Sequence, residues 1–237
     1  MRYAILLALL LFLPVRGGAW QVVGGDAPVS TYLLAEDFDG SSACGDGSHT
    51  NCSGSWTGIG TPAPADFNYA ASPAPLVGTG YSLLLSGTQD TPYGWYRGFT
   101  AHDTVYFYFV FHATNRSAGT IFALRDSSGN TVMRVVDSGP EMSIYCNDVI
   151  DYQPVTNFVV NTTYHTWGRY TKGTGSNAVC ELYHSTTSTK PESPNLSATG
   201  NATAQAAQIF ITKPGNDQSH IYDKIRVSTS SIGGDPL

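Results

Sequence analysis

The chain has 237 residues, of which 41% are hydrophobic and only 13% are charged, against about 25% charged in a typical globular domain. The formal net charge of −6 excludes the basic surface by which most proteins bind nucleic acids. Enough apolar residues are present for a buried core, which excludes a disordered chain, and 14 tyrosines and 25 glycines beside only four lysines and four glutamates favour an all-β protein.

The N-terminus has the pattern of a secretory signal peptide. Arg2 precedes an apolar run from Ala4 to Leu13, and Gly17 and Ala19 are small residues at the −3 and −1 positions of a cleavage site. The run is too short to cross a bilayer. We therefore expect a secreted or extracellular protein, possible locations including the periplasm and the cell surface, whose net charge becomes −8 when both N-terminal arginines are removed. The expected division is a signal peptide over residues 1–19, an extension over 20–31 and one domain over 32–234.

The rest of the chain is dominated by a period of two, which is typical of half-buried strands. In the strongest segment, Thr104–His112, valine and phenylalanine alternate with tyrosine and histidine. The polar stretches Ser53–Ala74 and Ser185–Ala202 are expected to be loops, and no stretch has the period of a substantial helix. About ten short strands with turn residues between them predict a single two-sheet antiparallel β-sandwich. The expected strands are residues 81–86, 93–99, 104–112, 120–125, 131–136, 142–147, 164–171, 178–184, 208–213 and 220–227.

All four cysteines follow the signal peptide, and an even number is typical of an oxidising compartment. Three pairings are possible. We favour Cys44–Cys52, which closes a small loop, together with Cys146–Cys180, which joins two predicted strands. The spacing lacks the CxxC pairs of common zinc sites.

Several segments together resemble the concanavalin A-like, or laminin-G-like, jelly rolls over about residues 32–234. They are the opening Leu33–Gly40, the pair Ala71–Leu76 and Tyr81–Leu83, then Phe122–Asn130, Tyr164–Gly173 and the closing Ile221–Ser230. The resemblance implies a jelly-roll sandwich with little or no helix. It does not select an activity, because this superfamily includes lectins, carbohydrate-binding modules, glycoside hydrolases and polysaccharide lyases.

Two enzymatic branches can be compared with the sequence through their motifs. The laminarinase-like hydrolases carry Glu-x-Asp-x-(x)-Glu on one strand, and none of the four glutamates stands in such an array. The alginate-lyase motifs are not present intact. The first expectation is therefore a secreted, non-catalytic domain that binds a polysaccharide or glycan. A divergent polysaccharide lyase or glycoside hydrolase is the first alternative, and a structural or adhesive extracellular protein is the second.

The expected ligand site consists of aromatic rings that stack on sugars, together with polar groups that form oriented hydrogen bonds. Arg125, Asn147 and Tyr183 are additional candidates from neighbouring strands. In the lyase alternative, His165 is the base, Tyr145 the acid and Arg169 the group that neutralises charge. The full predicted ligand set is Tyr106, Tyr108, His112, Arg134, Tyr145, His165 and Arg169.

Acidic residues gather at the first and last predicted strands, which often meet at a structural calcium site in jelly-roll carbohydrate-binding modules. Carboxylates are hard oxygen ligands that suit Ca²⁺. The predicted ligands are Glu36, Asp39 and Asp223. The alternative is a charged strand edge that discourages pairing with other chains.

Overall fold

The fold of the chain is given by a computed structural model. It describes residues 32–36, 38, 56–59, 67–70, 76, 82–85, 93–114, 119–138, 141–147, 149–151, 159–213 and 219–233. The predicted signal peptide, the N-terminal extension, Asp39 and the pair Cys44 and Cys52 lie outside these residues, and their assignments stay predictions.

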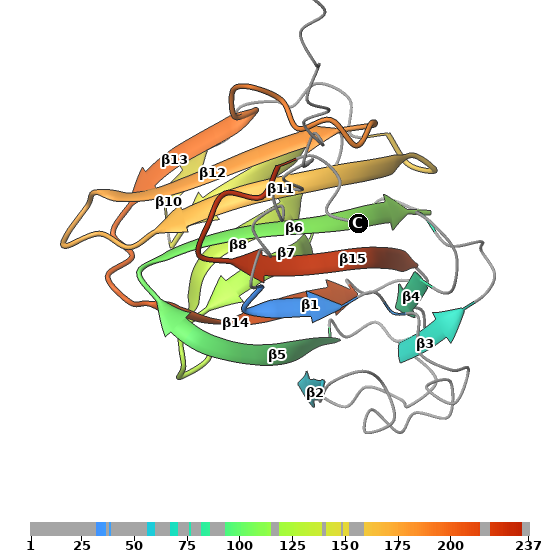
Figure 1. Ribbon diagram of the computed structural model, residues 1–237, viewed down its shortest axis with the longest axis horizontal. Helices are drawn as coiled ribbons and strands as arrows, with labels where there is room; N and C mark the ends of the chain where they lie inside the picture. Colours follow the sequence, from blue (N-terminus) through green and yellow to red (C-terminus); the bar gives the residue numbers. More distant parts are fainter. Residues whose placement is uncertain are drawn as a thin grey trace, which may run out of the picture.

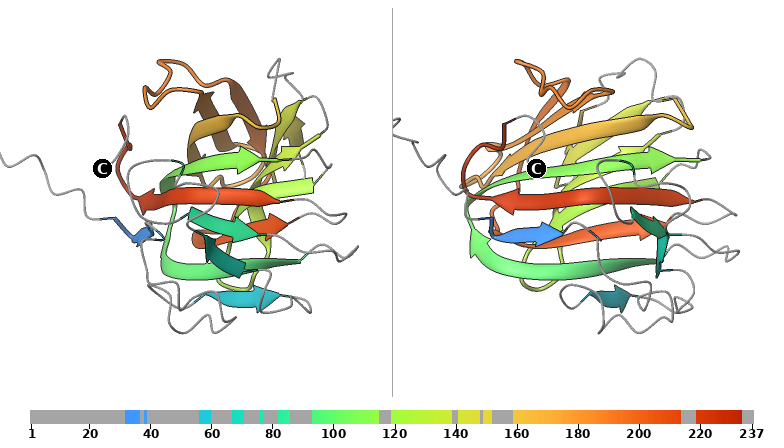
Figure 2. Two further views of the ribbon diagram at one scale, coloured as in Figure 1. Left: turned by 90° about the vertical axis from the view of Figure 1, so that its right-hand side faces the viewer. Right: turned by 45° about the vertical axis from the view of Figure 1, so that its right-hand side comes forward.

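The described residues form two antiparallel sheets packed face to face, which confirms the predicted all-β sandwich. Sheet A lies in front in Figure 1, with β7, β8 and β14 of sheet B behind it, and the turned views of Figure 2 show the same layers. Sheet A has the order β13 (Leu196–Gly200), β12 (Ala178–Ser185), β11 (Thr163–Thr171), β6 (Thr104–Ala113), β15 (His220–Ser228), β4 (Ser82–Leu85) and β3 (Phe67–Ala70), with β1 (Leu34–Glu36) paired to β15. Sheet B has the order β10 (Val149–Asp151), β9 (Met142–Cys146), β8 (Thr131–Asp137), β7 (Gly119–Arg125), β14 (Ala206–Lys213), β5 (Tyr93–His102) and β2 (Thr57–Ile59).

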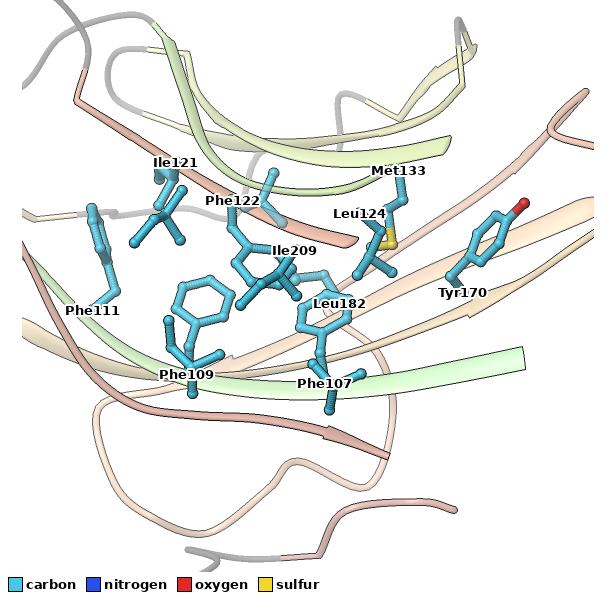
Figure 3. Packing of buried hydrophobic residues seen from close by; sticks show 14 of the residues in the cluster. Phe107, Phe109, Phe111, Ile121, Phe122, Leu124, Met133, Tyr170, Leu182 and Ile209 are labelled. Carbon is cyan, nitrogen blue, oxygen red and sulfur yellow. The ribbon is translucent and has the colours of Figure 1, made fainter. Parts of the chain in front are cut away.

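The core lies between the sheets because strand alternation sends every second side chain inward. Phe107 and Phe109 of β6 stack on Phe122 of β7, with ring centroids 4.7 and 4.6 Å apart. Figure 3 shows these rings meeting from the two sheets, with Leu124 and Ile209 beside them. Fully burying one such side chain contributes about 1.5–3 kcal/mol, so this aromatic layer is a main source of stability.

A disulfide joins the two sheets at one end of the sandwich. Cys146 of β9 is bonded to Cys180 of β12, with a Cα–Cα distance of 5.5 Å, which is an ordinary spacing for a disulfide. This pairing was predicted from the sequence and is confirmed.

Two segments predicted as loops contain strands. β2 and β3 lie within Ser53–Ala74, and β13 lies within Ser185–Ala202. In β13, Leu196, Ala198 and Gly200 point inward at alternate positions, but only one of them is a large apolar residue, so the period of two is weak in the sequence. The strand is stabilised by its pairing with β12. The short β10 was also missed. The described segments contain no helix with the length and apolar character of a membrane span.

Candidate functional site

Most of the predicted ligand residues lie on the outward face of sheet A, the side turned away from the core. The strand β6 pairs with β11 so that Tyr106 lies opposite Arg169 and Tyr108 lies opposite Trp167. This register brings five predicted residues to one face: Tyr106, Tyr108, His112, His165 and Arg169.

The middle of that face is covered by other parts of the chain. Tyr108 is completely buried in a small apolar cluster with Val110, Trp167 and Ile232. Ile232 belongs to the segment after β15, which runs back in front of sheet A in Figure 1. The Tyr108 hydroxyl makes a 2.8 Å hydrogen bond with Nδ1 of His165, which is itself 7% exposed. These rings therefore pack against the protein and do not form an open surface.

The flank of the same face has its charges paired internally. Arg169 Nη2 donates to Glu181 Oε1 at 2.7 Å, and the Tyr183 hydroxyl donates to Glu181 Oε2 at 3.1 Å. Lys190 Nζ lies 4.2 Å from the centroid of the Tyr183 ring. Both carboxylate oxygens are thus engaged, and the Arg169 charge already has a partner. His112, at the other end of β6, makes a 3.2 Å hydrogen bond to Thr163.

The remaining predicted residues, Arg134 and Tyr145, lie on the outward face of sheet B, on the opposite side of the sandwich. The seven residues therefore do not line one groove. For the same reason the structure does not bring together the three residues of the lyase alternative, because His165 and Arg169 belong to sheet A and Tyr145 belongs to sheet B.

One row of cross-strand partners runs over the outward face of sheet B. Tyr96 of β5 lies opposite Phe210 of β14, which lies opposite Ala123 of β7. Ala123 lies opposite Arg134 of β8, and Arg134 lies opposite Tyr145 of β9. With about 4.8 Å between neighbouring strands, the row from Tyr96 to Tyr145 is about 19 Å long. This length suits an extended chain of several small units better than a single small molecule.

Two guanidinium groups on this face stack on aromatic rings. Arg125 Cζ lies 3.4 Å from the centroid of Phe210, and Arg134 Cζ lies 3.9 Å from the centroid of Tyr145. The Phe210 ring in turn lies against Gly94, where a Cβ atom would come within 2.5 Å of it. The glycine therefore lets the ring lie close to the sheet, in the position that supports Arg125.

A hollow of about 430 Å³ opens beside the Arg125 stack. Its wall combines one phenol ring, from Tyr96, with the polar groups of Arg125 and Gln208. Gln208 is the cross-strand partner of Arg125, so both side chains leave the same face of the sheet. Ser127 and Ser128 of the β7–β8 turn form another part of the wall.

That turn is held by the side chain of Asp126. Its Oδ1 accepts hydrogen bonds from the backbone N–H groups of Ser128 and Asn130 at 2.9 and 2.8 Å, and Gly129 occupies the left-handed region with φ of 88°. Burial acts to raise the pKa of Asp126, but the hydrogen bonds from Asn130, Ser128 and Gly129 outweigh it and lower the pKa. The ionised carboxylate therefore fixes the serines at the rim of the hollow.

Tyr96 and Gln208, which line the hollow, were not predicted, and neither was Phe210, which is buried beneath Arg125. A signal for Tyr96 was present, because one set of alternate positions in the segment Tyr93–Phe99 holds only this tyrosine and two glycines. That pattern leaves Tyr96 between Gly94 and Gly98 on one face of β5. Nothing in the sequence placed Gln208 and Phe210 beside it. Of the additional candidates, Arg125 belongs to this site and Tyr183 lies on sheet A. Asn147 follows β9, and its Nδ2 donates a hydrogen bond to Asn201 Oδ1 at 2.8 Å.

The predicted calcium ligands are placed on different sides of sheet A. Glu36 is buried and pairs with Arg97 of sheet B at 2.7 Å, whereas Asp223 accepts a hydrogen bond from Ser82 at 3.3 Å on the outward side. Among the described residues there is no group of three or more acidic, histidine or cysteine side chains that could hold a metal ion. Asp39 lies outside those residues, and the calcium site stays a prediction.

Comparison with solved structures shows the fold. An alginate lyase of family PL-14 from Aplysia kurodai superposes with a TM-score of 0.54 and 8% identity, over 84% of this chain and 100% of the other. The catalytic domain of a glycoside hydrolase family 131 protein from Coprinopsis cinerea gives 0.54 and 13%, over 86% and 98%. An endo-β-1,4-glucuronan lyase from Trichoderma reesei gives 0.50 and 12%, over 73% and 88%.

The likeness to these structures confirms the predicted β-sandwich at the level of architecture. The sequence itself matches no protein-family model, and no curated protein matches it. At such low identities the likeness defines the class of fold and not the activity.

Proposed function

We propose that this protein is an exported polysaccharide-binding sandwich whose site is the outward face of sheet B. The observation that carries this proposal is the 430 Å³ hollow, in which the Tyr96 ring stands beside the side chains of Arg125 and Gln208. Sugars are recognised by this combination, because a ring stacks on the apolar face of the pyranose while polar groups bond its hydroxyls.

The surroundings of the hollow support a chain-like ligand. From it the row continues through Phe210 and the small Ala123 to Arg134 and Tyr145, which lies about 19 Å from Tyr96 at 4.8 Å per strand. The likeness to enzymes named for alginate, glucuronan and glycoside substrates agrees with a carbohydrate ligand. The Cys146–Cys180 disulfide agrees with export to an oxidising compartment.

The test is binding of soluble polysaccharides by affinity electrophoresis and by isothermal titration calorimetry. We expect at least one polysaccharide to bind, and Tyr96→Ala to weaken that binding about tenfold, the effect of losing a ring contact of about 1.5 kcal/mol. Tyr106→Ala is the matched control, because Tyr106 is a partly buried tyrosine on sheet A. If no polysaccharide binds, or if only Tyr106→Ala weakens binding, the proposal is wrong.

A lyase is the second candidate, because Arg125 and the Tyr96 phenol line the same hollow. In β-elimination a base removes the proton beside the sugar carboxylate, the electron pair forms a C=C bond, the glycosidic C–O bond breaks, and an acid protonates the departing oxygen. Arg125 would neutralise the carboxylate, and Tyr96 would take both proton-transfer roles, its phenolate accepting the proton from the sugar and the resulting phenol returning it to the departing oxygen. The measurement is the ultraviolet absorbance of the unsaturated product. Turnover that Tyr96→Phe abolishes without loss of binding would support the lyase, and binding without any product would exclude it.

A further inference from the structure

The arginines of the described residues fall into two groups. Arg97 and Arg169 each pair with a glutamate at 2.7 Å, and Arg226 donates to the backbone oxygen of Glu36 at 3.0 Å. Within the part of the chain that the structure describes, the guanidiniums of Arg125 and Arg134 make no hydrogen bond and no ion pair. Each of these two only stacks on a ring.

Leaving a cation unpaired is costly where it is desolvated. Arg125 Nε is buried without a partner, and burial lowers the pKa of this guanidinium. The chain has more acidic than basic residues, with a formal charge of −6, yet none of the described acidic side chains pairs with Arg125 or Arg134. An anion supplied from outside the protein would remove the cost.

The stacking also prepares the two groups for such a partner. A ring beneath a guanidinium fixes its plane and leaves the two terminal Nη groups at its edge, a pair of donors that matches a carboxylate or a sulfate. Preorganisation of this kind lowers the entropy lost when the anion binds.

The two stacks are neighbours along the ligand row. Arg134 lies opposite Ala123, and Arg125 lies two residues further along β7, so the arginines are diagonal neighbours on adjacent strands. Such neighbours have Cβ atoms on the order of 8 Å apart. Two anionic groups carried on one extended chain could therefore reach both arginines at once.

We propose that the ligand of this face is a polyanionic polysaccharide, which places one carboxylate or sulfate on Arg125 and another on Arg134. This inference rests on the proposed function and adds the chemical class of the ligand. Binding of the second anionic group on the same chain is intramolecular, so the two contacts act together.

The experiment is titration of the intact protein with three probes: sodium alginate for carboxylates, dextran sulfate for sulfates, and unmodified dextran as the neutral chain. We expect a charged probe to bind at least tenfold more tightly than dextran, and less tightly as salt is added. Arg125→Gln and Arg134→Gln should each weaken that binding at least tenfold. Arg169→Gln is the matched control, because Arg169 is already paired with Glu181 on the other sheet. Whether alginate or dextran sulfate binds more tightly identifies the anionic group.

Each other outcome has a definite meaning. Dextran binding as tightly as the charged probes, with both variants unchanged, overturns the inference and leaves the proposed function standing. An equal loss of binding in Arg169→Gln also overturns the inference, because any positive charge on the protein would then attract the anionic probe to the same extent. No binding of any probe overturns the inference together with the proposed function. Arg125→Lys keeps the charge but loses the planar stack, so an intermediate loss with an unchanged melting temperature separates recognition from misfolding.

Discussion

The disulfide between the sheets offers the most direct test of how this sandwich is stabilised. Cys146 and Cys180 are both fully buried, and they are 34 residues apart in the sequence. Replacing both by alanine opens that loop in the unfolded chain. The chain-entropy relation gives a loss of about 3.8 kcal/mol for a loop of this length. At about 2–4 °C for each kcal/mol in a domain of this size, the melting temperature should fall by about 8–15 °C.

Urea unfolding followed by tryptophan fluorescence, together with thermal unfolding followed by circular dichroism, measures both quantities. The denaturant m-value should rise, because an unfolded chain without the crosslink exposes more surface. Cys44→Ala/Cys52→Ala is the comparison: if these two cysteines pair as the sequence predicts, the same relation gives about 2.5 kcal/mol for a loop of eight residues. A loss below about 1 kcal/mol for the inter-sheet pair, or a larger loss for the short loop, would refute the reasoning.

Three further changes test other parts of the structure. Gly94→Ala should displace the Phe210 ring, since the new Cβ would stand 2.5 Å from it, and should cost about 1–3 kcal/mol of stability and weaken polysaccharide binding in a calorimetric titration. Arg97→Ala should cost about 3–5 kcal/mol in urea unfolding, because it removes the cation that pairs with the buried Glu36 carboxylate. His184 has its pKa lowered by burial from 6.5 to about 4, so the unfolded chain takes up the proton first. The free energy of unfolding should therefore be unaffected by protonation of His184 above pH 6.5 and should fall by about 1–3 kcal/mol as the pH falls toward 4. His184→Gln should flatten this part of a plot of urea midpoint against pH.

Each of these changes has a control. At Gly98 a Cβ would meet only the Ala207 oxygen, at 3.9 Å, so Gly98→Ala should preserve stability; a loss equal to that of Gly94→Ala would contradict the argument. Adding Glu36→Gln to Arg97→Ala should recover part of the loss of stability, and no recovery would show that the buried Glu36 charge is not its cause. An unchanged pH profile in His184→Gln would assign the acid sensitivity to carboxylates.

The class of fold and the positions of the strongest strands were predictable from the amino-acid sequence. The alternation in Thr104–His112 is sufficient because a period of two decides which side chains leave each face of a strand. Strands with weak apolar patterns, such as Leu196–Gly200, were missed since pairing to β12 stabilises them more than their own composition does.

The candidate site was only partly predictable for a related reason. Alternation predicted outward positions for Tyr106 and Tyr108, and Tyr145 was added from another predicted strand, but alternation contains no information about which strands become neighbours. Only the tertiary structure put Tyr145 on the other sheet, in a row with Phe210 and Tyr96.

Tertiary packing also decided which face was covered. The segment that follows β15 brings Ile232 onto Tyr108, more than 120 residues away in the chain, and so closes the surface that the sequence favoured. The arginine stacks of sheet B likewise join residues from separate strands: Arg125 lies on Phe210, and Arg134 on Tyr145. Local periodicity determines the face of a strand, whereas long-range pairing and packing determine which faces meet a ligand.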